Sequence, residues 1–249
     1  MLAPRSWGLS ADRVDLTRTR AEPLPATLAA LPQEVVVDLR RAAIIVVDMQ
    51  NDFCATGGWL DSIGVDVEPA RSAIPHLQAV LPEARRLGMP VVWLNWANRP
   101  DRLNLPANVL HVYDGDGSGG GIGDRSGASE AVLTEGSWGA AIVDGLEPAE
   151  GDIHVGKYRM SGFWDTPLDS ILRALDVDTL FFTGVNADQC VLATLTDAAC
   201  AGYDCVLVEG AAATTSPSFC LDATLYNVRQ CFGFTLTADD LTATLGGLP

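Results

Sequence analysis

Short, continuous apolar runs alternate along the chain with longer stretches of helical periodicity. An uninterrupted apolar run of four to six residues is typical of a strand that is buried on both faces of a parallel sheet. The pattern predicts six such strands, at residues 42–47, 91–96, 152–155, 179–183, 205–208 and 232–236.

The stretches between these runs carry apolar residues at helical spacing. They predict helices at about residues 67–87, 167–175, 188–201 and 218–229. Strands joined by helical crossovers form an α/β fold, a doubly wound three-layer sandwich with a mainly parallel central sheet. Ligand sites of such folds lie at the carboxyl ends of the strands. Asp48, Lys157 and Cys190 each come shortly after a predicted strand, so we expect them to meet at one edge of the sheet.

The length of 249 residues suits a single large domain. We predict one domain over residues 33–249, preceded by an N-terminal extension at 1–32 that serves as an arm against a neighbouring subunit or as a lid. The glycine-rich stretch 114–124 contains the pattern GxGxxG at Gly115, Gly117 and Gly120. Neither a preceding strand nor a following helix start accompanies it, which favours a loop or lid edge over a dinucleotide site.

Charge and composition exclude several classes of partner. The net charge of −16 argues against a nucleic-acid partner, which requires concentrated Lys and Arg. No apolar run reaches the roughly 18 residues of a membrane span, and no secretory signal is visible, so we expect a cytoplasmic protein with no membrane partner. Its six cysteines are then free thiols. With three histidines and neither CxxC nor HExxH, we expect no metal and no cofactor.

Lys157 is the only lysine among 16 basic residues. A general bias of the chain toward Arg explains the bulk count. At this one position, however, a compact ammonium can approach an anion in a way that a planar guanidinium cannot.

Cys190 lies at the start of the helix predicted over 188–201. The positive end of that helix would favour a thiolate, and its free N–H groups could bind an oxyanion. The alternative is that Cys190 is a small buried hydrophobic residue. We assign that simpler role to the cysteines inside predicted helices or strands, which are Cys200, Cys205, Cys220 and Cys231.

Four segments carry a family resemblance. They are 44–53 (IIVVDMQNDF), 135–140 (EGSWGA), 156–163 (GKYRMSGF) and 183–190 (TGVNADQC). In this order they resemble the signatures of isochorismatase-like hydrolases, and the match spans about residues 42–235. The resemblance implies that Cys190 is the nucleophile, Asp48 its general base and Lys157 the assisting cation. It also implies a cis peptide at Val185–Asn186, an oxyanion hole formed by the backbone N–H groups of Asn186 and Cys190, and a homo-oligomer.

Three further segments distinguish branches of this family. Nicotinamidases have a metal site with an Asp-x-His pattern, and the matching stretch here is Asn95-Trp96-Ala97. The segments 95–101, 103–108 and 163–170 instead resemble biuret, triuret and ureidoacrylate amidohydrolases, which implies cleavage of a small ureido-type amide through a Cys190 thioester. Streptothricin hydrolase, which opens a lactam, is the alternative. A non-catalytic binding protein of the same fold is a remote one.

The segment 226–232 is similar to one that carries a substrate-binding Gln in biuret hydrolase, which would be Gln230. Capping of its own helix is an equally good explanation of this residue. The other candidates for substrate contact are polar or aromatic residues near the motifs: Asn51, Phe53, Trp59, Trp96, Arg99 and Trp164. Any one of the aromatic residues could instead belong to the core.

Overall fold

The computed structural model describes residues 6–18, 20–124 and 131–249. Its centre is a six-stranded sheet of order β10-β9-β8-β5-β6-β7, in which every neighbouring pair is parallel. The strands are β5 (Ala42–Val47), β6 (Val91–Trp96), β7 (Ile153–Lys157), β8 (Thr179–Gly184), β9 (Asp204–Ala212) and β10 (Gly233–Thr237). This is the predicted sheet.

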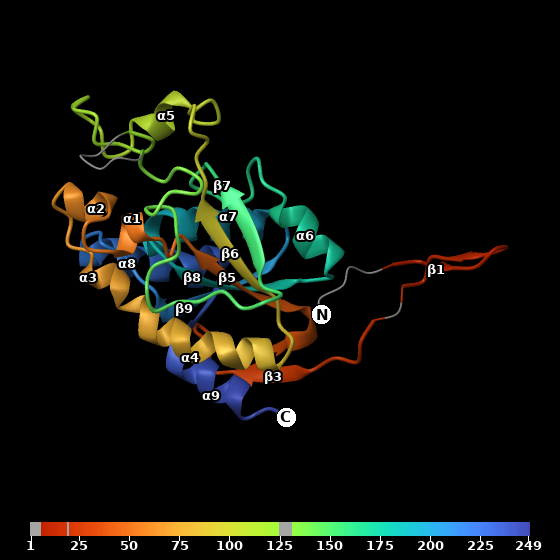
Figure 1. Cartoon of the computed structure of the whole chain (residues 1–249). Helices are drawn as coiled ribbons and strands as arrows, with labels where there is room; N and C mark the ends of the chain where they lie inside the picture. The colour runs from red at the N-terminus through yellow and green to blue at the C-terminus, as the bar shows by residue number, and fades with distance from the viewer. Residues whose placement is uncertain (1–5, 19, 125–130) are drawn as a thin grey trace.

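Helices cover both faces of the sheet (Figure 1). On one face lie α4 (Ala73–Arg86) and α9 (Ala238–Gly246), which pack against each other and on β9. On the other face lie α6 (Leu168–Ala174) and α7 (Leu192–Cys200), with α8 (Ser218–Asn227) packed beside the segment that precedes α7. The architecture is therefore the expected three-layer sandwich.

The chain leaves the centre of the sheet in opposite directions. From β5 it proceeds to β6 and β7 on one side, and from β8 it proceeds to β9 and β10 on the other. The switch point between β5 and β8 is where open α/β sheets bind their ligands. Both strands are fully buried, which explains why their sequences are apolar throughout. Gly184 ends β8 with a φ of +95°, and a Cβ there would collide with the backbone of Val47. Glycine thus lets the two strand ends approach closely.

The observed boundaries differ from the expected ones where a chain segment bends. The helix predicted over 67–87 is divided at Ser72 into α3 (Glu68–Arg71) and α4. The helix predicted from 188 begins instead with a π-helical turn, η2 (Ala187–Val191), and the one predicted to end at 229 continues into a second π-helical turn, η3 (Val228–Phe232). Short helices α1 (Asn51–Cys54), α2 (Trp59–Ser62) and α5 (Ala107–Leu110), a 3-10 turn η1 (Leu39–Arg41) and the whole of α9 were not predicted.

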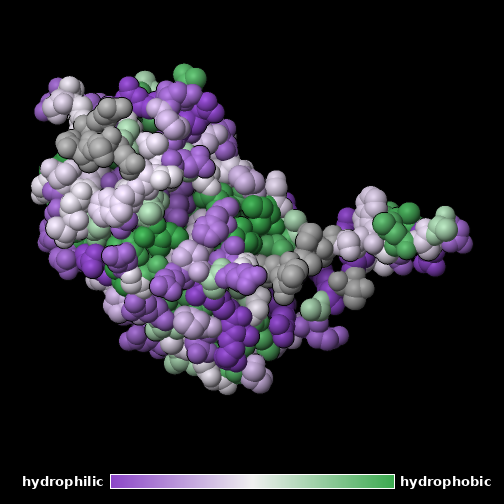
Figure 2. All heavy atoms as spheres, in the orientation of Figure 1, coloured by the Kyte–Doolittle hydropathy of each residue, from purple (hydrophilic) through white to green (hydrophobic). Residues whose placement is uncertain are grey.

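Two small hairpins precede the sheet and behave differently. The first pairs β1 (Gly8–Leu9) with β2 (Val14–Asp15) and projects away from the body, with hydrophobic atoms on its surface (Figures 1 and 2). The second pairs β3 (Pro25–Leu28) with β4 (Val35–Asp38) and packs on α9. Leu28 is completely buried. Residues 25–28, which we expected in the extension, are thus part of the folded body.

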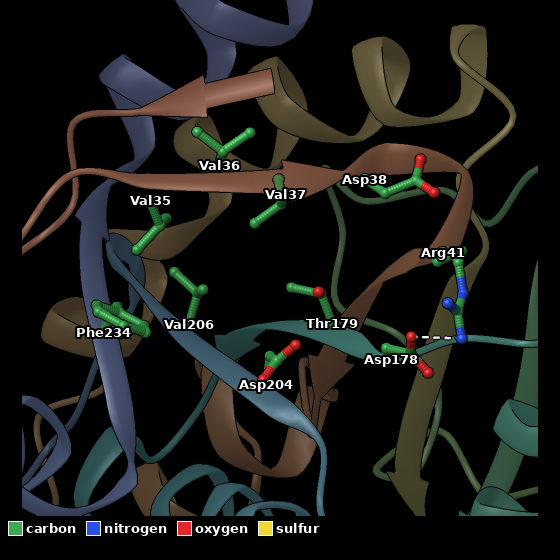
Figure 3. A pocket seen from close by; sticks show the side chains of 10 residues that line it. All are labelled: Val35, Val36, Val37, Asp38, Arg41, Asp178, Thr179, Asp204, Val206 and Phe234. Carbon is green, nitrogen blue, oxygen red and sulfur yellow. Dashed lines mark ion pairs between the residues drawn. The ribbon is translucent and has the colours of Figure 1, made fainter. Parts of the chain in front are cut away.

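A cavity of about 440 Å³ lies at the amino edge of the sheet (Figure 3). Arg41 and Asp178 form an ion pair in its wall, and Asp204 lies nearby. This edge is opposite the one where Asp48 follows β5. No helix in the described ranges has the length and apolarity to cross a membrane.

The cysteines do not share one environment. Cys205 is buried in β9, as expected. Cys200 and Cys231 are exposed and Cys220 is only half-buried, so the expectation that all four are buried was wrong for these three. Cys200 is the last residue of α7, and Cys231 lies in η3, the turn before β10. All six cysteines are free.

Candidate active site

Asp48, Lys157 and Cys190 converge at the carboxyl edge of the sheet, as the sequence predicts. Asp48 follows β5 directly with a φ of 51°, and its N–H donates to the carbonyl of Leu94 (2.9 Å). Lys157 is the last residue of β7, and its Nζ lies 2.8 Å from Oδ2 of Asp48. Cys190 lies in η2, and its thiol interacts with the Asp48 carboxylate. All three side chains are buried.

Trp96 lies on the strand between those that lead to Asp48 and carry Lys157. β6 separates β5 from β7, and its last residue, Trp96, is paired in register with Lys157. The ammonium of Lys157 lies 4.0 Å from the centroid of the indole ring, a cation–π distance. The indole N–H is buried and acts as a hydrogen-bond donor toward the Cys190 sulfur, which favours the thiolate. Trp96 therefore holds the Lys157 side chain on its path to Asp48.

The two acidic groups of the site are both held toward their neutral forms. Burial raises the pKa of Asp48 above its ordinary value, and the nearby Lys157 ammonium opposes that rise. Burial likewise raises the pKa of the Cys190 thiol to about 12, although Lys157 favours the thiolate. From the helix start we expected a lowered pKa, and here burial outweighs the helix end. At neutral pH the resting sulfur is a thiol, so any thiolate has to form by transfer of the proton to a neighbouring base.

The turn that carries Cys190 is fixed at both ends. The carbonyl of Asn186 accepts hydrogen bonds from the N–H groups of Gln189 (3.0 Å) and Val191 (3.2 Å). The hydroxyl of Thr194 donates to the carbonyl of Cys190 (2.7 Å) and accepts from the N–H of Gly162 (3.1 Å). The peptide between Val185 and Asn186 is cis, as the resemblance implied.

Three of the candidate contact residues, Asn51, Phe53 and Trp59, are buried near the site. Phe53 packs edge-on against Trp59, with ring centroids 5.9 Å apart, and Trp59 packs in the same way against Tyr113 at 5.5 Å. The side-chain amide of Asn51 donates to the carbonyl of Trp138 (2.8 Å). Asn51 therefore anchors the loop before β7.

Three candidates are not brought to the triad. Trp164 is 63% exposed, and its Nε1 donates to Asp197 on α7. Arg99 pairs with Asp101 on an exposed loop. Gln230 is exposed and precedes β10, whose first residue is paired with the start of β9, so it lies at the amino edge of the sheet. These corrections share one cause, because position along the chain does not reveal which edge or surface a side chain reaches.

Residues that we did not single out complete the surroundings of the sulfur. Sδ of Met160 lies 3.7 Å from Sγ of Cys190. The Gln50 side chain donates to the carbonyls of Trp96 (2.9 Å) and Ala140 (2.7 Å), and its Oε1 accepts from the N–H of Trp96. Both residues lie inside segments that carry the family resemblance. Gln50 is two positions after Asp48, and Met160 is three positions after Lys157. That proximity was the signal available in the sequence.

A cavity of about 460 Å³ lies beside this site. It is lined by Val112, Tyr113, Met160, Gln189 and Ala193. The first two of these residues directly precede the glycine-rich stretch 114–124. If the lid extends over residues 112–136, its residues 125–130 lie outside the described residues. Within the described residues, no three His, Cys, Asp or Glu side chains gather as a metal-binding group.

Known proteins share both this fold and this sequence pattern. The model of the isochorismatase domain matches residues 42–240. Ureidoacrylate amidohydrolase RutB of Rhizobium rhizogenes is 34% identical over 219 residues, which are 88% of this chain and 89% of the relative. The chain belongs to the isochorismatase family.

Two solved structures are similar as well. An isochorismatase family protein of Desulfovibrio vulgaris is 28% identical with a TM-score of 0.68, and the match covers 83% of this chain and 99% of that one. N-carbamoylsarcosine amidase of Thermoplasma acidophilum is also 28% identical, with a TM-score of 0.61 over 80% of this chain and 96% of the other. Both confirm the predicted fold.

Proposed function

We propose that the protein is a cysteine amidohydrolase that cleaves the C–N bond of a small ureido-type amide through a thioester on Cys190. The observation that carries this proposal is the buried Lys157–Asp48 ion pair, 2.8 Å long, in contact with a buried thiol at the switch point of the sheet. The activities named for ureidoacrylate amidohydrolase and N-carbamoylsarcosine amidase support it, because these names describe amide hydrolases of a ureido compound and of a carbamoyl compound.

The reaction begins with transfer of the thiol proton from Cys190 to Asp48. Sγ attacks the carbonyl carbon, and the backbone N–H groups of Asn186 and Cys190 bind the resulting oxyanion. When this intermediate collapses, the C–N bond breaks and Asp48 returns the proton to the leaving nitrogen. The charge of Lys157 balances the negative charge, first on the carboxylate and then on the sulfur.

Hydrolysis of the thioester regenerates the enzyme by the same groups. Asp48 takes a proton from a water molecule, whose oxygen attacks the acyl carbon. The C–S bond breaks, and the sulfur recovers its proton from Asp48. No residue other than Asp48 and Cys190 has to change its protonation state.

A lactam-opening activity of the streptothricin hydrolase type is the alternative substrate class. The same first step on a cyclic amide leaves the amine attached to the acyl group, so ring opening releases no ammonia. A product assay therefore separates the two classes. A non-catalytic binding protein would release neither product.

The proposal also covers the oligomeric state and the cellular location of the protein. We infer a homo-oligomer, in which the projecting β1–β2 hairpin contacts a neighbouring subunit, and a cytoplasmic location. Exposed hydrophobic side chains on the hairpin, Leu9 and Val14, support the first inference. Six free cysteines suit a reducing compartment.

The test compares the wild-type protein with Cys190→Ala and Cys190→Ser. Each is incubated with biuret, triuret, ureidoacrylate, nicotinamide and streptothricin, and ammonia release and product mass are measured. We expect ammonia from at least one ureido compound, loss of that activity in both variants, and unchanged circular dichroism. Cys231→Ser, which alters an exposed cysteine at the opposite edge, is the matched control and should keep full activity. An active Cys190→Ala protein would overturn the proposal.

A further inference from the structure

The cavity beside Cys190 has an apolar lining. Val112, Met160 and Ala193 contribute only hydrophobic surface, and Tyr113 contributes its ring. None of the described residues that line it is charged. The lining has one amide, that of Gln189, and its Nε2 donates to the hydroxyls of Tyr113 (3.2 Å) and Ser216 (3.3 Å).

The cavity adjoins the reacting sulfur. Met160, in its wall, is in van der Waals contact with Cys190, at 3.7 Å between the two sulfur atoms. Gln189 immediately precedes the nucleophile, and Ala193 follows it by nearly one helical turn on the same segment. A group bound in the cavity would therefore lie next to the carbonyl that Cys190 attacks. Methionine is flexible enough to shift as such a group enters.

The outer wall of the cavity is held in place. Tyr113 packs edge-on against the buried Trp59, with an interplanar angle of 85°. The indole N–H of Trp59 in turn donates to the carbonyl of Gly120 (2.7 Å). These contacts fix the segment from Val112 to Gly120 over η2, so the cavity is built into the fold.

We propose that the substrate carries an uncharged apolar substituent of several carbons, which occupies this cavity while Cys190 attacks the adjacent amide. This inference rests on the proposed amidohydrolase function and narrows its substrate class. A fully polar ureide would find few partners there, because the lining offers only the Gln189 amide and the Tyr113 hydroxyl, and a carboxylate would find no described cation in the lining. An alkyl or aryl group instead exchanges water for apolar contacts.

A homologous series of monosubstituted ureas, from methylurea to pentylurea, tests the proposal, with one carboxyalkylurea of similar length as the charged comparison. Every member releases ammonia on cleavage, so one assay serves all of them. In the wild-type protein we expect kcat/KM to rise about fourfold for each added methylene until the cavity is full. The carboxyalkylurea should be cleaved more slowly than pentylurea. A flat or falling series would overturn the inference and leave the amidohydrolase function standing.

Ala193→Leu partly fills the cavity without lowering helix propensity appreciably. We expect it to lower the ratio of pentylurea to methylurea kcat/KM by about tenfold or more, the value of nearly two methylenes. Ala201→Leu, at the exposed end of the same helix, is the matched control and should leave that ratio unchanged. Equal loss on both ureas in Ala193→Leu would contradict the proposal.

Binding separates failure of this inference from failure of the proposed function. Calorimetric titration of the Cys190→Ala protein with methylurea and pentylurea requires no turnover. Tighter binding of pentylurea, abolished by adding Ala193→Leu, supports the apolar site even if the wild-type protein cleaves none of the compounds. Equal affinity for the two ureas would overturn it.

Discussion

The two edges of the central sheet carry similar groups in opposite surroundings. At the carboxyl edge, Lys157 pairs with Asp48, and both side chains are 0% exposed. At the amino edge, Arg41 pairs with Asp178, and these are 27% and 48% exposed. Each pair lies near a cavity of similar volume, about 460 Å³ and 440 Å³. Charge and cavity alone therefore do not distinguish a reactive site from an ordinary surface hollow.

Burial accounts for the difference. Water screens the pair at the amino edge, and such exposed ion pairs contribute little to stability. The buried pair at the carboxyl edge loses its hydration and depends on mutual attraction, so each partner governs the protonation of the other. The same burial holds the Cys190 thiol neutral. Proton transfer between Cys190 and Asp48 is then the most accessible way to create a nucleophile.

The largest difference in stability and activity is expected between variants that break one ion pair or the other. Lys157→Met leaves a buried carboxylate without a partner, which should lower the free energy of unfolding by about 3–5 kcal/mol. Loss of a charge-stabilising group should also reduce kcat/KM by about 10²–10³-fold or more. Arg41→Met also removes an ion pair with Asp176 and a hydrogen bond to its carbonyl, so it should cost about 1–2 kcal/mol, less than Lys157→Met, and leave activity unchanged. Urea unfolding and ammonia release measure both effects.

The pH dependence of Lys157→Met provides a check on the cause. Burial places the pKa of Asp48 above its value in the unfolded chain, so the folded protein binds that proton more readily. The stability that this proton confers is present at low pH and is lost as the pH rises through the raised pKa. In Lys157→Met the ammonium no longer opposes the effect of burial, so the pKa of Asp48 should be raised further than in the wild-type protein. The loss of unfolding free energy relative to the wild-type protein should therefore become smaller at acid pH. A deficit that is the same at pH 5 and pH 8 would point to packing instead.

Removing both charges should restore stability without restoring activity. In Asp48→Asn/Lys157→Met no buried charge remains, and the free energy of unfolding should return most of the way to the wild-type value. Asn is chosen because the φ of 51° at position 48 suits Asn better than an apolar residue. Denaturant unfolding of the two single variants and the double variant gives the coupling energy. Simple additivity would mean that the pair is not coupled.

Alkylation compares cysteines at the two edges. Burial raises the pKa of Cys190 to about 12, so little thiolate forms by loss of the proton to water at pH 7. In Asp48→Asn, which cannot accept the thiol proton, the rate of Cys190 with iodoacetamide should rise about tenfold per pH unit between pH 7 and pH 10. Cys231, exposed near the amino edge, reports the reagent's reactivity in the same sample. Peptide mass spectrometry separates the two. A plateau for Cys190 below pH 9 would indicate a preformed thiolate.

The smallest expected effect concerns the two tryptophans of β6. Trp96→Phe weakens the cation–π contact with Lys157, and a loss of about 1 kcal/mol corresponds to about fivefold in kcat/KM. Trp93→Phe is the matched control, because its Nε1 donates to Asp152 (2.8 Å) near the amino end of β7. It should lower stability by about 0.5–1.5 kcal/mol and leave kcat/KM unchanged. Equal losses of kcat/KM in Trp96→Phe and Trp93→Phe would mean that Trp96 has no specific role in the active site.

The sequence predicts those parts of the molecule that are determined by an uninterrupted local pattern of apolar residues. The runs at 42–47 and 91–96 were predicted with both boundaries, because each changes abruptly from apolar to a polar or turn-forming segment. The meeting of Asp48, Lys157 and Cys190 follows from the rule that parallel strands share a carboxyl edge. Two-residue strands such as β1 and β2 carry no detectable period, so their hairpin was not predicted.

Contacts made across loops were beyond prediction. Met160 meets Cys190 only because the segment after β7 folds back over η2. The raised pKa of Cys190 depends on burial by several distant segments, whereas the sequence reveals only the nearby helix start. Gln230 lies at the amino edge because α8 and η3 carry the chain back to that edge before β10 begins.

The solitary lysine has a practical consequence. Lys157 is 0% exposed, and the sequence contains no other. Amine-directed dyes, crosslinkers and resins would find no side chain on the folded surface to modify. Modification of Lys157 by such a reagent would therefore require the carboxyl edge of the sheet to open. The rate of modification measures this opening without any engineered label.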